Sequence, residues 1–186
     1  MQVTRIVGIS GSLRQGSFNA SLLRAAAGLM PAGVDLSIET IRGIPLYDGD
    51  VEAQQGIPAV VAQLKDQIAA AHGLLLVTPE YNNSIPGVFK NAIDWMSRPA
   101  ADIARVFGGR KVALIGASPG GFGTILSQNA WLPVLRTLGT DLWTPGRLMV
   151  SRAGNVFAAD GTLSDDKVRE QLRSYLQGFV AFVAGA

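Results

Sequence analysis

The sequence contains no cysteine in its 186 residues, which excludes disulfide bonds, thiolate nucleophiles and cysteine-ligated metals. It contains a single histidine, His72, so a zinc site or another histidine-rich metal site is not expected either. Charged residues make up only 16% of the chain, whereas roughly 25% is usual for a soluble domain. The low charge favours an oligomer in which part of the surface is covered.

Long hydrophobic runs and clusters of like charge are missing as well. No apolar stretch approaches the roughly 20 residues that a membrane-spanning helix needs. Residues 1–7 do not form the apolar segment of a secretory signal peptide. The net charge of +2 comes from scattered Lys and Arg and not from a basic tract, which argues against a nucleic-acid partner. We therefore expect a cytoplasmic protein without nucleic-acid or membrane partners.

Apolar segments rich in β-branched residues alternate with helical patterns along the chain. The sequence predicts strands at residues 3–9, 34–41, 73–78, 111–116 and 142–150, and helices at 18–30, 58–71, 86–97, 124–138 and 164–183. This order predicts an α/β three-layer sandwich in which helices cover both faces of a doubly wound parallel sheet. No repeat or linker divides the chain, so we expect a single domain over residues 1–186.

Three loops, at residues 10–19, 78–87 and 117–124, carry the unusual residues of the sequence. They follow the first, third and fourth predicted strands. Open parallel sheets bind their ligands beyond the carboxyl ends of the strands. The three loops are therefore expected to meet around one ligand.

The first loop, residues 10–19, has the composition of a phosphate-binding turn. It leads into a helix, where free backbone N–H groups favour an anion. Ser12, Ser17 and Asn19 add neutral donors, and Arg14 adds a permanent positive charge. The Walker and dinucleotide-binding glycine patterns are both absent, so a phosphate would be held here without a metal. The alternative is an ordinary turn with Ser17 as the helix N-cap and Arg14 in solvent.

The second loop, residues 78–87, combines an aromatic ring at Tyr81 with a carboxylate at Glu80 and amides at Asn82 and Asn83. A planar heterocycle needs a flat apolar wall and a few polar groups for the ring edge. In the alternative interpretation Asn82 and Asn83 occupy left-handed turn positions, and Tyr81 is a partly buried anchor.

The third loop, residues 117–124, is rich in glycine and leaves space for a ring or a ribityl chain. It also contains the pattern G-x-S-x-G from Gly116 to Gly120, which would place a serine nucleophile at Ser118. However, the α/β-hydrolase order requires a histidine after the serine, and the only histidine, His72, precedes it. A serine hydrolase is therefore not expected.

At these loops the sequence resembles the NAD(P)H-dependent FMN reductase family, and most of all its bacterial chromate and quinone reductases. The matching residues are Gly11-Ser12-Leu13-Arg14 with Ser17 and Asn19, Pro79-Glu80-Tyr81-Asn82 with Ser84 and Pro86-Gly87, and Lys90-Asn91-Ala92-Ile93-Asp94-Trp95. The resemblance implies a flavodoxin-like fold with a five-stranded parallel sheet in the order 2-1-3-4-5. It also implies a homodimer or homotetramer, with the motif from Lys90 to Trp95 at a dimer contact.

The resemblance further implies non-covalently bound FMN, with NADPH or NADH as co-substrate. The cofactor-binding residues that it implies are Ser12, Arg14, Ser17, Phe18 and Asn19 in the first loop, Pro79, Glu80, Tyr81, Asn82 and Asn83 in the second, and Ser118, Gly120 and Gly121 in the third. No side chain is expected to be catalytic, because the flavin carries the chemistry.

The expected activity is the NAD(P)H-dependent reduction of a small-molecule electron acceptor by ping-pong hydride transfer. Quinones, chromate, azo compounds and free flavin are the acceptors that the resemblance implies. The alternatives are a non-enzymatic flavodoxin-like electron carrier and a flavin-binding sensor. Flavodoxins are typically very acidic, so the net charge of +2 argues against the carrier.

Overall fold

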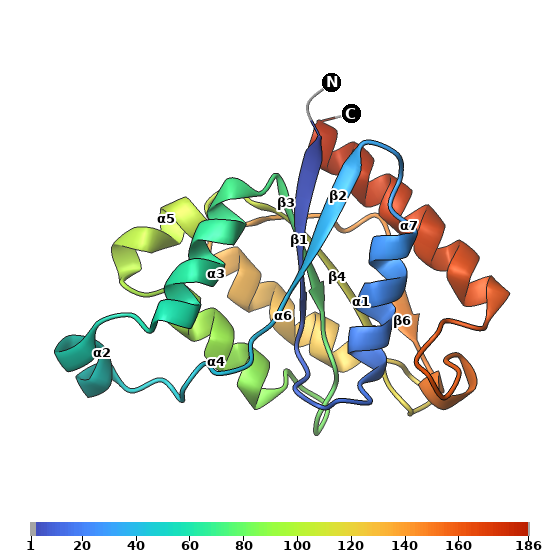
Figure 1. The fold of residues 1–186 in the computed structure, drawn as a ribbon, viewed down its shortest axis with the longest axis horizontal. Helices are drawn as coiled ribbons and strands as arrows, with labels where there is room; N and C mark the ends of the chain where they lie inside the picture. Colours follow the sequence, from blue (N-terminus) through green and yellow to red (C-terminus); the bar gives the residue numbers. More distant parts are fainter. Residues whose placement is uncertain (1–2, 186) are drawn as a thin grey trace.

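A parallel β-sheet lies between two layers of helices in the computed structural model, which describes residues 3–185 (Figure 1). Its strands are β1 (Thr4–Ser10), β2 (Val34–Glu39), β3 (Gly73–Val77), β4 (Lys111–Ala117), β5 (Asp141–Leu142) and β6 (Leu148–Val150). The strand order is β2-β1-β3-β4-β5, β6 also pairs with β4, and these pairs are all parallel. The predicted α/β sandwich with the flavodoxin-like order 2-1-3-4-5 is therefore confirmed.

The predicted fifth strand, residues 142–150, is split in the structure into β5 and β6. β5 pairs with the start of β4, and β6 pairs with its end. Between them, Pro145 lacks the N–H that a continuous strand would donate. The ring of Trp143 lies so close to Gly146 that a Cβ there would be 2.3 Å from it. The prediction of one continuous strand is wrong because this apolar segment folds around the Trp143 ring.

The long helices cover the two faces of the sheet (Figure 1). α1 (Phe18–Gly28) and α7 (Asp166–Ala184) pack on one face, and α3 (Ala59–Ala70), α4 (Gly87–Met96) and α6 (Ile125–Thr137) pack on the other. The predicted helices are all present with slightly different ends. The sequence analysis missed the short helices α2 (Gly49–Gln55) and α5 (Ile103–Val106) and the 3-10 turns η1 (Ala100–Asp102) and η2 (Ala153–Asn155), which are too short for a periodic pattern.

Within residues 3–185, no helix combines the length and the apolar character needed to cross a membrane.

The central strand β3 separates two hydrophobic cores. Leu74 and Leu76 pack into the core under α3, α4 and α6, whereas Leu75 and Val77 pack into the core under α1 and α7. All residues of β3 are buried. The unbroken apolar run of this segment predicted a strand covered on both faces, and the structure confirms it.

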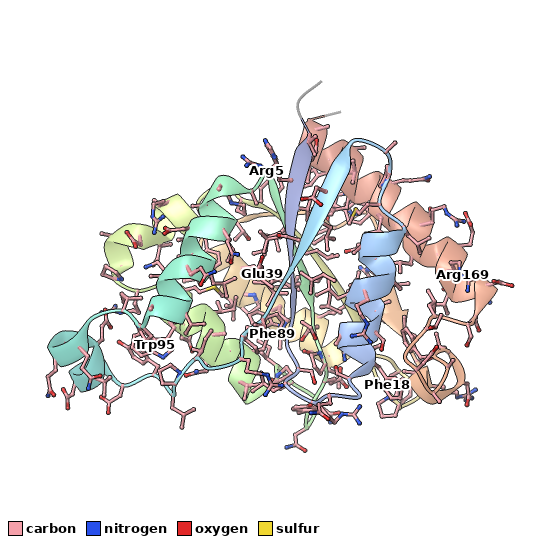
Figure 2. The ribbon with its side chains drawn as sticks, viewed as in Figure 1. Arg5, Phe18, Glu39, Phe89, Trp95 and Arg169 are labelled. Carbon is pink, nitrogen blue, oxygen red and sulfur yellow. The ribbon has the colours of Figure 1, made fainter. Side chains whose placement is uncertain are left out.

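The connection from β2 to α3, residues 40–58, is held against α4 by two residues of the family motif. Trp95 Nε1 and Asn91 Nδ2 both donate to the carbonyl oxygen of Pro45, at 2.9 and 2.8 Å. Asn91 Oδ1 in turn accepts a hydrogen bond from the backbone N–H of Tyr47 (2.9 Å). Trp95 therefore lies beside this connection (Figure 2). Asn91 and Trp95 thus have an architectural role, while the dimer contact stays a prediction.

A second tether fixes the helix α2 within this connection. The carboxylate of Glu52 accepts hydrogen bonds from Arg98 Nε (2.8 Å) and from the Tyr47 hydroxyl (2.9 Å). The hydrogen bond from Arg98 holds the pKa of Glu52 below its ordinary value. The contribution of this tether is therefore present at neutral pH and is lost as the pH falls through the lowered pKa.

We expect Gly116→Ala to lower the free energy of unfolding by about 2–3 kcal/mol, the usual cost of forcing extra atoms into a packed interior. A Cβ at Gly116 would lie 2.2 Å from the backbone oxygen of Thr78 and 2.2 Å from Oγ1 of Thr124. Gly28→Ala is the matched control, because no atom lies within 4 Å of a Cβ at that position. We expect it to be neutral or to stabilise α1 by up to about 1 kcal/mol. Urea unfolding measures both, and equal stability of the two variants would contradict the close approach of these segments.

Candidate functional site

The three predicted loops meet at one edge of the sheet, the lower edge in Figure 1. We call residues 10–17, 78–86 and 118–124 together the loop edge. Each loop starts where its strand is still hydrogen-bonded to a neighbour. Gly11 N donates to the oxygen of Val77 in β3 (2.9 Å), and Thr78 N donates to the oxygen of Ile115 in β4 (2.8 Å). Because the strands end in register, the loops that follow them lie side by side.

The first loop ends in the N-cap of α1. Ser17 is buried and its Oγ accepts a hydrogen bond from Ala20 N (3.3 Å), as the alternative interpretation predicted. The guanidinium of Arg14 lies 5.7 Å from the ring centre of Phe18, above the start of α1. In residues 3–185, no carboxylate forms an ion pair with Arg14. The start of α1 thus carries a positive charge that no acidic side chain neutralises.

Asn19 joins the first loop to the third. Its Oδ1 accepts from the backbone N–H of Ala117 (2.9 Å), and its Nδ2 donates to the oxygen of Ala117 (2.8 Å). Asn19 is only 4% exposed, so its side chain makes these two hydrogen bonds inside the protein. It ties the start of α1 to the end of β4. A contact with phosphate, through the second Nδ2 hydrogen, stays a prediction.

The first loop contains one further candidate, Ser10, to which the sequence analysis assigned no role. Ser10 is the last residue of β1, and its Oγ is buried without a hydrogen-bond partner in residues 3–185. Strand alternation places it on the face of Ile6, which packs in the core with α1. A buried polar atom without a partner is costly, and it is often explained by a ligand or an ion. Its position as the first residue of the loop, where β1 ends, was the signal in the sequence.

Gly11 shows how tightly the first loop approaches α4. A Cβ at Gly11 would lie 2.1 Å from the ring of Phe89, which is fully buried and lies near the lower end of β1 (Figure 2). Only glycine lets the backbone pass over this ring. The first loop thus packs against α4 and is hydrogen-bonded to β3.

The second loop forms a tight turn. Tyr81 N donates to the oxygen of Ser84 (3.2 Å), and Ser84 N donates to the oxygen of Tyr81 (3.0 Å). The two residues between them, Asn82 and Asn83, have φ of 49° and 60°, the left-handed conformation that the alternative interpretation predicted. Tyr81 is half exposed at 50%, so its ring is available to a ligand at the loop edge.

Glu80 connects the second loop to α6. Its Oε2 accepts hydrogen bonds from the backbone N–H groups of Leu126 (2.8 Å) and Ser127 (3.0 Å), at the first turn of that helix. Thr124, the residue at the N-cap of α6, makes no capping hydrogen bond with its own side chain. The carboxylate of Glu80 therefore caps the helix from another segment and lies at the positive end of the helix dipole.

A buried hydrogen-bond network supports the second loop from below. Thr78 Oγ1 donates to the oxygen of Pro79 (2.9 Å) and accepts from Trp131 Nε1 (3.0 Å). It also lies 2.9 Å from Ser127 Oγ, which is then the donor because the Thr78 hydroxyl proton is already used. Thr78, Ser127 and Trp131 are fully buried. This network fixes the point at which the loop leaves β3.

The third loop folds back on the segment after β6. The oxygen of Ser118 accepts from Ala153 N (3.0 Å), and the oxygen of Gly120 accepts from Arg152 N (2.9 Å). Ser118 Oγ accepts from the N–H of Gly120 (3.2 Å). No protein atom lies within 4 Å of a Cβ at Gly121, so the space there is open.

The geometry also argues against a serine hydrolase. His72 immediately precedes β3, whereas Ser118 follows β4, so the two lie at opposite ends of these parallel strands. Nδ1 of His72 accepts a hydrogen bond from the backbone N–H of Arg5 (2.9 Å), beside the start of β1. The only histidine is thus held away from the loop edge.

Known proteins similar to this chain include reductases of flavins and of quinones. Residues 4–155 match a family model described as NADPH-dependent FMN reductase. The chain is 45% identical to an NAD(P)H-dependent FMN reductase of Pseudomonas aeruginosa, covering 96% of this chain and 95% of that protein. It is 37% identical to a 2-hydroxy-1,4-benzoquinone reductase of Burkholderia sp, covering 96% of each. The solved structure of FerB, a flavoenzyme NAD(P)H:(acceptor) oxidoreductase of Paracoccus denitrificans, has a TM-score of 0.87 at 32% identity, with 98% of both chains covered.

We expect Glu80→Ala to lower the free energy of unfolding by about 1–2 kcal/mol, because it removes the cap of α6. Glu80→Gln keeps an oxygen but loses the charge at the helix N-terminus, and is expected to lose less. Glu39→Gln is the control, since the Glu39 carboxylate accepts no hydrogen bond in residues 3–185. Thermal unfolding distinguishes the three variants. If Glu80→Ala unfolds at the same temperature as the control, Glu80 does not cap α6.

Proposed function

This chain belongs to the NADPH-dependent FMN reductase family, and on that basis we propose that it reduces quinones or related small acceptors with electrons from NAD(P)H. FMN is its cofactor, and NADPH or NADH is its co-substrate. The relatives named as a benzoquinone reductase and an acceptor oxidoreductase support the choice of acceptor. Chromate, azo compounds and free flavin are further acceptors under this proposal.

The observation that carries the proposal is the fit of the loop edge to a phosphorylated flavin. The buried hydroxyl of Ser10 has no partner in residues 3–185, and it lies at the end of β1 where the loop begins. Arg14 forms no ion pair with an acidic side chain of residues 3–185, so its charge is available to a phosphate. The first turn of α1 adds backbone N–H groups. The positive charge and the hydrogen-bond donors of this loop therefore suit an anion such as a phosphomonoester.

We assign the three loops to different parts of FMN. The first loop would hold the phosphate, and the second and third would border the ring. The residues in these roles are Ser12, Arg14, Ser17, Phe18 and Asn19 for the phosphate, and Pro79, Glu80, Tyr81, Asn82, Asn83, Ser118, Gly120 and Gly121 for the ring. The half-exposed Tyr81 and the open space at Gly121 support the second group.

The chemistry that FMN supplies when bound is acceptance of hydride from NAD(P)H and delivery of electrons to the acceptor. The side chains of the chain bind and orient the cofactor, and we assign none of them as acid or base. Glu80 keeps its carboxylate on the N-terminus of α6, which fixes the loop beside the ring. Asn19 keeps the first and third loops at a constant separation. These hydrogen bonds fix the positions of the three loops relative to one another.

We further propose that residues 1–186 form one FMN-binding domain and work as a homodimer or homotetramer. The coverage of 98% of both this chain and FerB supports the single domain. The low content of charged residues, 16%, supports the oligomer. We propose the cytoplasm as its compartment, where NAD(P)H is available.

The decisive experiment is reconstitution with FMN. We expect the purified protein to bind one FMN per chain and to bleach at flavin wavelengths when NADPH is added without oxygen. Steady NAD(P)H oxidation with a benzoquinone then separates an enzyme from an electron carrier or a sensor. A protein that stays colourless after incubation with excess FMN contradicts the proposal.

Arg14→Ala tests the phosphate loop directly. Loss of one charge-assisted contact predicts FMN binding weaker by about tenfold or more. Arg5→Ala is the control, because Arg5 lies at the opposite end of β1 (Figure 2). Flavin fluorescence titration measures both. Unchanged FMN affinity in Arg14→Ala would contradict the assignment.

The ping-pong mechanism has its own kinetic test. If NAD(P)⁺ leaves before the acceptor enters the same site, initial rates at several quinone concentrations give parallel double-reciprocal lines. Intersecting lines would show that both substrates bind together, and the ping-pong mechanism would be rejected while the reductase activity remained.

A further inference from the structure

We propose that Arg42 is a positioning residue that orients the phosphate loop and gives the protein its preference for FMN over riboflavin. The inference rests on the proposed function, because it concerns the same loop. Nη2 of Arg42 donates to the carbonyl oxygen of Leu13 at 2.6 Å. Arg42 belongs to the connection after β2 and lies 29 residues from Leu13 in the sequence.

We call residues 12–16 of the first loop the phosphate loop. Few other hydrogen bonds hold this segment in place. Residues 13–16 are all exposed, and Gln15 and Gly16 form a turn. In the part of the chain that the structure describes, the segment 12–16 makes no backbone–backbone hydrogen bond to a distant segment. Within the segment, Arg14 N approaches Ser12 Oγ at 3.4 Å, which is a long contact. Arg42 thus provides the only hydrogen bond, within residues 3–185, that reaches this segment from outside.

The hydrogen bond from Arg42 sets the direction of one peptide unit. The carbonyl of Leu13 and the N–H of Arg14 belong to the same planar trans peptide, so they point in opposite directions. When Arg42 holds the carbonyl oxygen, the N–H of Arg14 is directed to the other side, toward Ser12 Oγ. A carbonyl oxygen carries partial negative charge and would repel a phosphate. Arg42 therefore directs the carbonyl oxygen of Leu13 away from the phosphate and leaves the N–H of Arg14 beside the Ser12 hydroxyl.

The position of Arg42 is itself fixed, and its charge is unopposed. Its backbone N–H donates to Thr40 Oγ1 (3.1 Å), which stabilises the turn from which the side chain starts. Neither Arg42 nor Arg14 pairs with a carboxylate of residues 3–185. Two cations thus flank the loop from different segments, which suits the double negative charge of a phosphomonoester.

The test compares FMN with riboflavin, because these flavins differ only in the phosphate. In Arg42→Ala we expect the dissociation constant for FMN to rise about tenfold, the order of one charge-assisted hydrogen bond, while that for riboflavin changes less than about twofold. Arg42→Lys keeps the charge but not the planar fork, and is expected to lie between Arg42→Ala and the unsubstituted protein. Arg24→Ala is the control, because its guanidinium contacts Ser21 within α1 (2.9 Å). Fluorescence titration of each variant gives both constants.

The outcomes separate this inference from the proposed function. If the unsubstituted protein binds FMN no more tightly than riboflavin, the phosphate site and the role of Arg42 are both rejected. If it prefers FMN and Arg42→Ala keeps that preference, only the role of Arg42 is rejected. Equal weakening of FMN and riboflavin in Arg42→Ala would indicate a general loss of structure and would overturn the proposal.

Discussion

The site depends first on the buried exchange of hydrogen bonds between the Asn19 amide and the backbone of Ala117. α1 crosses the sheet after β1, and this exchange fastens its first turn to the end of β4. Without it, the first and third loops would be joined only through packing. Because both backbone groups of Ala117 are satisfied by one side chain, the side of β4 that faces away from β6 is held at that point.

Hydrogen bonds from side chains also connect the loops to other segments. A polar side chain joins the first loop, and another joins the second loop, to a segment that is distant in the sequence. Glu80 reaches the start of α6, and the Thr78 hydroxyl is held by Trp131 beneath the second loop. Arg42 reaches the carbonyl of Leu13. Glycine at position 11 allows the first loop to touch the ring of Phe89. A rigid sheet thus carries short loops whose positions are set from outside, which suits a site that must accept a flat cofactor and leave one side open.

The amino-acid pattern predicted the elements and their order because each long strand and helix has a strong local signal. The apolar run of β3 is one example, since burial on both faces requires apolar side chains at every position. The segment 142–150 was also predicted as one strand, yet it splits into β5 and β6 around Trp143. Pro145 and Gly146 are the local signal of this break, whereas the partner of the Trp143 ring, Tyr175, is supplied by α7 and is visible only in the structure.

The sequence by itself therefore determined the fold class, the strand order implied by the family motifs, and the three loops that carry the candidate site. The fold class and the three loops follow from periodicity and from residue types within single segments, whereas the strand order was implied by the resemblance to the family. Only the tertiary structure decided what Asn19, Glu80 and Arg42 contact, because each finds its partner between 29 and 98 residues away. Hydrogen bonds over such separations depend on how the chain is folded back, and no local pattern encodes them.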